Sequence, residues 1–134
     1  GFQEVIDDTF VQKVEDVKKV LFCSGKIYYE MAERQKTEQR TDIAIVRIEQ
    51  LYPLDQKELE FVLRPYTNVE KIWLQEEPAN MGAWSHFLVR FGATIAGHPF
   101  SGASRAASAS PATGSPSSHK IEQQEILDRA FARA

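Results

Sequence analysis

The chain has 134 residues, of which 43% are hydrophobic and 26% charged, and its formal net charge at pH 7 is -3. This length suits one domain with its own core, and the composition is that of an ordinary globular protein. The negative charge argues against a nucleic-acid-binding surface, which needs clustered Lys and Arg. No apolar run approaches the roughly 20 residues that a membrane helix requires.

The beginning of the chain looks like the middle of a longer protein. It lacks an initiator Met and opens on Gly1-Phe2-Gln3, so we expect an excised fragment with Gly1 as a cloning remnant. Residues 1–17 mix acids with scattered apolar residues, and we interpret them as a lead-in segment from an upstream domain, ordered at best in part. The domain itself is predicted to span residues 18–134.

Strands and helices are predicted to alternate through the first half of the domain. The continuous apolar run of residues 20–23 indicates that the first strand, at 19–23, is covered on both faces. The β-branched and mostly apolar residues 43–48 indicate a second strand, and residues 69–74 a third. A helix is expected over about residues 26–39, after a turn at Ser24-Gly25.

A second helix is expected between Asp55 and Pro65. Asp55 can cap its first turn, with Glu58 three residues further on as in a capping box. Leu59, Val62 and Leu63 would form its buried face, and Pro65 would stop it.

The second half of the chain gives weaker signals. From about Asn80, apolar residues at helical spacing predict a long helix, and Gly97, His98 and Pro99 would end it. Its apolar positions are Trp84, Phe87, Leu88, Phe91 and Ile95. The small residues of 100–114 are typical of a flexible linker, although a strand could lie at 105–109. A last helix is expected over about 118–132, with Ile121, Ile126, Leu127, Ala130 and Phe131 on its apolar side.

This order of elements predicts an α/β fold of three layers, in which helices flank a mostly parallel sheet with right-handed crossovers. The acids Glu76 and Glu77 follow the third strand, where function often sits in such folds. Successive strand residues point to opposite faces, so the two acids need not share a site. We therefore expect a structural or interface role for Glu76 and Glu77 rather than a catalytic one.

The turn after the first strand is a candidate anion site. Ser24, Gly25 and Lys26 would stand at a helix N-terminus, where backbone N–H groups favour anions. Arg47, near the end of the second strand, and Arg105 could add positive charge at the same sheet edge. The competing interpretations are a plain tight turn, a solvated Lys26, and an Arg47 that pairs with Glu49 or Glu76 because a buried charge needs a partner.

Other candidates for chemistry are weak. Cys23 ends an apolar strand and is expected to be a small buried hydrophobe; as the single cysteine it excludes an internal disulfide and fits a reducing compartment. The three histidines show no metal-ligand spacing, and Trp73 and Trp84 are most simply core residues. The residues alone predict a compact domain with no active site or metal site of its own.

Four motifs resemble one known family in order and over nearly the whole chain. They are Cys23-Ser24-Gly25-Lys26-Ile27-Tyr28-Tyr29, Ile45-Val46-Arg47-Ile48-Glu49-Gln50-Leu51-Tyr52-Pro53, Gln75-Glu76-Glu77-Pro78 with Gly82-Ala83-Trp84, and Ala107-Ser108-Ala109-Ser110-Pro111-Ala112-Thr113-Gly114. The chain is similar to the C-terminal region of the 2-oxoglutarate dehydrogenases, the first components of the 2-oxoglutarate dehydrogenase complex. The 2-oxoadipate-type dehydrogenases share these motifs.

This resemblance implies a fold like the transketolase C-terminal domain. It also implies that thiamine diphosphate and Mg bind in upstream domains of the parent enzyme, because the Gly-Asp-Gly motif of the cofactor site is absent here. No catalytic residue carries over, and the fragment alone is expected to bind no cofactor and to be inactive. Some members of the family bind acetyl-CoA or an adenine nucleotide as an activator.

The function implied is that of a C-terminal, non-catalytic domain for assembly and allosteric regulation of an oxidoreductase of the tricarboxylic acid cycle. The parent enzyme would decarboxylate 2-oxoglutarate and pass the succinyl group to the lipoyl arm of the succinyltransferase component, as a homodimer in a bacterial cytoplasm or a mitochondrial matrix. The alternatives are a pure interaction module, a sensor of CoA esters or nucleotides in a 2-oxoadipate-type enzyme, and the equivalent domain of another thiamine enzyme.

Overall fold

The computed structural model describes residues 5–49, 55–78, 94–95, 98–105 and 116–133. The elements are β1 Val5–Ile6, a 3-10 turn at Val14–Asp16, β2 Lys19–Cys23, α1 Ile27–Thr37, β3 Ile43–Ile48, α2 Gln56–Leu63, β4 Glu70–Pro78, β5 Thr94–Ile95, β6 His98–Pro99, β7 Ser101–Arg105 and α4 Pro116–Ala130. The predicted strands at 19–23 and 43–48 therefore have the expected bounds.

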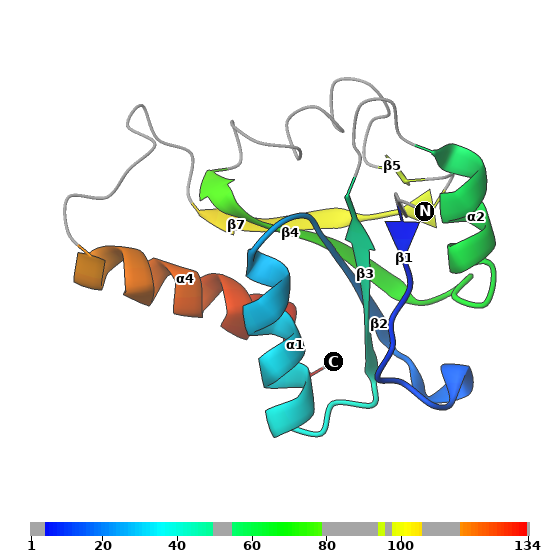
Figure 1. Ribbon diagram of the computed structural model, residues 1–134, viewed down its shortest axis with the longest axis horizontal. Helices are drawn as coiled ribbons and strands as arrows, with labels where there is room; N and C mark the ends of the chain where they lie inside the picture. Colours follow the sequence, from blue (N-terminus) through cyan, green and yellow to red (C-terminus); the bar gives the residue numbers. More distant parts are fainter. Residues whose placement is uncertain (1–4, 50–54, 79–93, 96–97, 106–115, 134) are drawn as a thin grey trace.

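Five strands form one twisted sheet in the order β1-β3-β2-β4-β7 (Figure 1). β3, β2, β4 and β7 are parallel, and the short β1 runs antiparallel to β3 at one edge. The prediction that the three apolar strands are parallel neighbours is confirmed. Their carboxyl ends consequently meet at one edge of the sheet, with Cys23 opposite Arg47.

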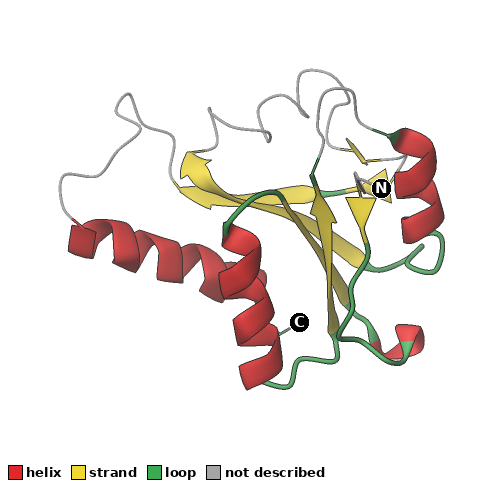
Figure 2. Ribbon diagram, viewed as in Figure 1, coloured by secondary structure: helices red, strands yellow, loops and turns green. Residues whose placement is uncertain are grey.

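Helices cover both faces of this sheet, which confirms the predicted α/β architecture of three layers (Figure 2). Side chains of β2 alternate between the two faces, as they must in a strand. Val20 and Phe22 join the core beneath α2, whereas Leu21 and Cys23 join the core beneath α1 and α4. Both cores are apolar because each strand residue between the helix layers is removed from water.

The helix starts and stops follow local chemistry. The side chain of Asp55 accepts a hydrogen bond from the Glu58 N–H (3.0 Å), as predicted, and α2 ends just before Pro65. At the end of α1, Gln39 adopts the left-handed conformation (φ 51°), and the Arg40 N–H bonds back to the Gln35 carbonyl (2.9 Å). This Schellman-type ending directs Arg40 beneath the last turn of α4.

The first segment is more than a lead-in, and the expectation of partial order is corrected for residues 5–17. β1 pairs with β3, and both Val5 and Val17 are buried in the core. Beyond β1, the Asp8 carboxylate accepts hydrogen bonds from the Ile45 N–H (2.8 Å) and from the Gln35 side chain (2.8 Å). A carboxylate thus replaces the missing partner strand along this part of β3.

The third predicted strand is longer than expected. β4 runs through Glu76 and Glu77 to Pro78, with an irregularity in its pairing to β7 between Leu74 and Pro78. The predicted end of this strand at Leu74 is therefore wrong, and both acids belong to β4. A β-bulge lets the strand continue past residues whose polarity suggests its end.

The predicted long helix and linker are revised where the structure describes them. Ile95 lies in the strand β5, which pairs antiparallel with β6, so its assignment to a helix is wrong. The positions from Asn80 to Phe91, Trp84 included, lie outside the described residues. β7 lies within the stretch 100–114 that is typical of a flexible linker, so that interpretation is wrong for residues 101–105. The strand suggested at 105–109 lies outside the described residues from 106 onward.

The C-terminal helix α4 is fixed to the sheet by cations at its carboxyl end. Lys19 Nζ donates to the carbonyls of Ala130 (2.9 Å) and Ala132 (2.7 Å), and Arg40 donates to that of Phe131 (2.6 Å). Positive charge at a helix C-terminus also stabilises the helix dipole. Among the residues predicted for the apolar side of this helix, Ile121 alone is exposed (60%), so its assignment to the buried side is wrong.

We expect Asp8→Ala to lower the free energy of unfolding of this chain by about 2–4 kcal/mol, because the Ile45 N–H and the Gln35 amide lose a charged acceptor. Urea unfolding followed by circular dichroism measures the loss. Glu15→Ala is the control, since it removes an exposed carboxylate of the same segment and should change stability by less than about 0.5 kcal/mol. Equal effects of the two substitutions would contradict the role given to Asp8.

Candidate functional site

The predicted anion site lies at the carboxyl edge of the sheet, where β2 turns into α1. Gly25 adopts a left-handed conformation (φ 79°), which a glycine reaches without a steric penalty. Lys26 is exposed and precedes the first residue of α1, and its side chain makes no capping hydrogen bond. Ser24 is half-buried in the same turn. These three residues therefore lie together at the N-terminus of α1, where the Tyr28 and Tyr29 N–H groups donate to the carbonyls of Gly25 (3.3 Å) and Lys26 (3.2 Å).

Arg47 reaches the same edge from the neighbouring strand but is already engaged. Its Nε donates to Glu49 Oε1 (3.0 Å), one of the two acids expected as its partner. Its guanidinium carbon lies 4.2 Å from the centre of the Tyr28 ring and 5.9 Å from that of Tyr29. A guanidinium stacked on an aromatic ring keeps N–H groups available at its rim, so one bond to Glu49 does not exhaust its donors.

Arg105 is not brought next to Arg47. It ends β7, with its backbone opposite Pro78 of β4, and two strands separate β7 from β3. Three strand spacings amount to about 14 Å between the two backbones. Lys26 and Arg47 therefore form one end of the candidate site, and Arg105 lies at the far end of the same sheet edge.

The two acids of β4 have different surroundings, as the alternation of a strand predicts. Glu76 is half-buried and accepts a hydrogen bond from the side chain of Gln123 on α4 (3.0 Å). Glu77 is exposed, and its carbonyl accepts a bond from the Gln75 amide (3.1 Å). Glu76 thus links β4 to α4, while Trp84 lies outside the described residues.

Cys23 is fully buried where β2 ends. Burial, as the largest effect, raises the pKa of its thiol to about 12, although the nearby Arg47 charge acts in the opposite direction. Almost no thiolate is present at neutral pH, and only the thiolate is a nucleophile. The prediction that Cys23 serves as a small buried hydrophobe is confirmed.

The contacts of Tyr28 and Tyr29 with Arg47 are not predicted from the sequence. Tyr28 and Tyr29 look like ordinary first-turn residues of a helix, and their rings contact each other edge to face at 5.4 Å. A usable signal does exist, because the first turn of a crossover helix lies above the end of the neighbouring strand. Aromatic residues there can contact a cation at the penultimate position of that strand, as Arg47 is in β3. Tyr29 is 66% exposed, so its ring is open to a planar ligand.

Among the described residues, no group of three His, Cys, Asp or Glu side chains is arranged to hold a metal ion. No described helix combines the length and apolar character needed to cross a lipid bilayer.

Comparison with known proteins identifies similar sequences. The family described as "2-oxoglutarate dehydrogenase C-terminal" matches residues 1–131. The "Multifunctional 2-oxoglutarate metabolism enzyme" of Mycobacterium sp. (strain JLS) is 51% identical over 120 residues, which cover 87% of this chain and 9% of that protein. The "2-oxoglutarate dehydrogenase E1 component" of Azotobacter vinelandii is 42% identical over 136 residues, and that of Haemophilus influenzae is 40% identical over 133. Each of these alignments covers 98% of this chain and 14% of the relative.

We expect Cys23 to react with Ellman's reagent in urea but to resist it in the folded protein at pH 8, because the buried thiol is almost fully protonated. Absorbance of the released product measures the rate. The double variant Cys23→Ser/Ser101→Cys is the control, since Ser101 is exposed. A folded wild-type chain that reacts as fast as this variant would show that Cys23 is accessible.

Proposed function

Because this chain belongs to the 2-oxoglutarate dehydrogenase C-terminal family, we propose that it is the C-terminal, non-catalytic domain of a 2-oxoglutarate dehydrogenase. The observation that carries the proposal is the family match over residues 1–131, together with relatives that are 40–51% identical. The chain spans 9–14% of the length of these relatives. The activity is therefore proposed for the parent protein.

The parent reaction in this proposal is oxidative decarboxylation of 2-oxoglutarate, followed by transfer of the succinyl group to a lipoyl arm of the succinyltransferase component. Thiamine diphosphate and Mg would supply that chemistry in upstream domains, and the described residues of this chain include no group of three His, Cys, Asp or Glu that could hold a metal ion. This domain would serve assembly of a homodimer through a transketolase C-terminal-like fold. The similarity to proteins of Mycobacterium and Azotobacter supports the bacterial cytoplasm rather than a mitochondrial matrix.

We expect the full-length enzyme to release CO2 from 2-oxoglutarate faster than from 2-oxoadipate, when thiamine diphosphate, Mg and a lipoylated acceptor are supplied. The 134-residue chain should neither bind thiamine diphosphate in calorimetry nor release CO2. Preference for 2-oxoadipate would assign the parent to the 2-oxoadipate-type enzymes. No decarboxylation of either acid would refute the proposed activity.

A regulatory role is the second part of the proposal. Lys26, the α1 N-terminus and Arg47 lie at one sheet edge, which is where α/β folds bind ligands. Their charge suits a phosphate or pyrophosphate, and the open ring of Tyr29 suits the adenine of acetyl-CoA or of an adenine nucleotide. A ligand would have to compete with Glu49 for Arg47.

The substitutions Lys26→Ala and Arg47→Ala should each weaken binding of acetyl-CoA or AMP to the full-length enzyme by about 1.5–3 kcal/mol. Glu49→Gln should instead tighten binding, because it removes both the competing carboxylate and its repulsion of the ligand. Calorimetric titration measures all three effects.

Lys36→Ala is the matched control, because Lys36 lies near the other end of α1, about 15 Å along the helix axis from Lys26. It should leave the affinity unchanged. Wild-type affinity in both cation variants, with the fold intact, would remove these residues from the site and favour a domain used for assembly alone.

A further inference from the structure

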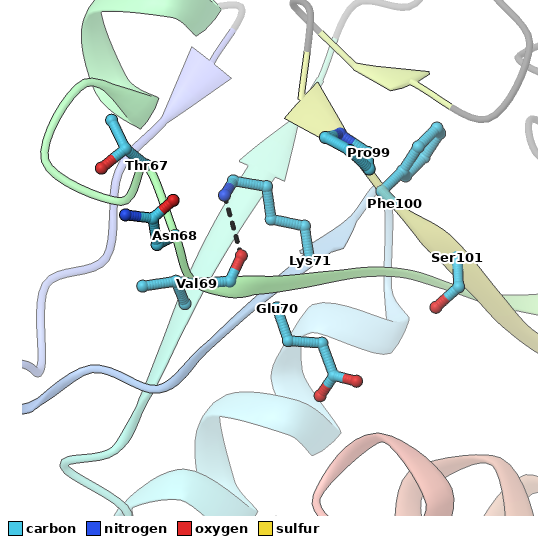
Figure 3. A pocket seen from close by; sticks show the side chains of 8 residues that line it. All are labelled: Thr67, Asn68, Val69, Glu70, Lys71, Pro99, Phe100 and Ser101. Carbon is cyan, nitrogen blue, oxygen red and sulfur yellow. Dashed lines mark hydrogen bonds between the residues drawn. The ribbon is translucent and has the colours of Figure 1, made fainter.

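A cavity of about 490 Å³ opens at the amino edge of the sheet, opposite the edge that carries the candidate regulatory site (Figure 3). It lies between the loop that enters β4 and the start of β7. Thr67, Asn68 and Ser101 give it polar walls, while Val69 and Phe100 give it apolar ones. It is open to solvent rather than enclosed, and its volume is comparable to that of clefts that bind small organic ligands.

Lys71 is the buried cation of this cavity. Only 3% of the residue is exposed. Its Nζ donates to the carbonyl of Val69 (2.9 Å) and to the carbonyl of Tyr66. Figure 3 shows the ammonium between the loop with Thr67 and Asn68 and the chain at Pro99. An ammonium has three N–H donors, so two carbonyls leave one donor over.

No carboxylate among the described residues forms an ion pair with Lys71. The adjacent Glu70 points to the other face of the sheet, where it lies 3.7 Å from Lys19. Burial accordingly lowers the pKa of the Lys71 ammonium. A buried charge of this kind is usually balanced by an opposite charge, which this chain does not supply in its described part.

We propose that this cavity binds a small carboxylic acid with an apolar body, whose carboxylate pairs with the Lys71 ammonium. The carboxylate supplies both the missing negative charge and an acceptor for the third N–H. The apolar body lies against Val69 and Phe100, and the exposed Ser101 and Asn68 form the rim. This site is separate from the proposed regulatory site and does not depend on it.

The competing explanation is purely structural, with Lys71 only holding the loop carbonyls of Tyr66 and Val69. Both explanations predict that loss of Lys71 destabilises the loop. They differ in whether the wild-type protein distinguishes an acid from its neutral amide, so benzoate and benzamide, which have the same shape, are the probes.

The experiment is equilibrium dialysis of labelled benzoate and benzamide against the full-length protein. Benzoate should bind saturably, and benzamide at least about tenfold more weakly, as expected for loss of one charged contact. Lys71→Met, which keeps the length of the side chain, should weaken benzoate to the level of benzamide. Lys57→Met, a substitution of an exposed lysine on α2, should change neither.

Hydrogen exchange of the wild-type protein keeps the test decisive if Lys71→Met fails to fold. Benzoate should slow amide exchange in residues 67–71 and 99–101, and benzamide should not. Equal binding of the two probes, benzoate binding that survives Lys71→Met, or unchanged exchange in both segments would each overturn the proposal.

Discussion

The burial of the central strand β2 on both faces is the constraint on which the rest of the structure depends. Each of its five residues is buried, and its apolar side chains require a layer of helix on either side. Lys19 at its start is the one charged residue of β2, and its ammonium is removed from water with the rest of the strand. The carbonyls of Ala130 and Ala132 accept hydrogen bonds from this ammonium. β2 is thus covered by α4 and also holds the C-terminal end of α4 in place through Lys19. Arg40 is a second cation that donates to a carbonyl at this end.

Sequence pattern was a good guide wherever burial is uniform along an element. β2 and β3 are apolar except for Lys19 and Arg47, and their bounds are predicted to the residue. β4 was predicted too short because Gln75 and Glu76 are polar; yet Gln75 is buried and accepts a hydrogen bond from the Trp73 indole (2.9 Å). Such side-chain hydrogen bonds depend on the tertiary structure, so no local sequence pattern predicts them. β7, made of Ser, Gly, Ala and Arg, carries too little apolar surface to stand out from a linker.

The candidate site was predictable in part for the same reason. The turn at Gly25 and the position of Arg47 at the neighbouring strand end follow from a parallel sheet alone. The stacking of Arg47 on Tyr28 and its bond to Glu49 depend on side-chain placement across two elements. The two edges of the sheet differ in how charge is balanced: the arginine at the carboxyl edge has its own carboxylate, whereas Lys71 at the amino edge has only backbone carbonyls.

The contacts that fix α4 join parts of the chain that are far apart in sequence. The hydrogen bond from Lys19 to Ala130 spans 111 positions, and that from Arg40 to Phe131 spans 91. Contacts of such long range slow folding, because a large loop must close before they form. On the ribosome, β2 and β3 can pair early, with α1 over one face of their sheet, but the part of that face that α4 covers stays open to water until residues 116–133 have been made. The domain therefore completes this hydrophobic layer late, and the partly covered sheet is the state that a chaperone would bind or that would aggregate.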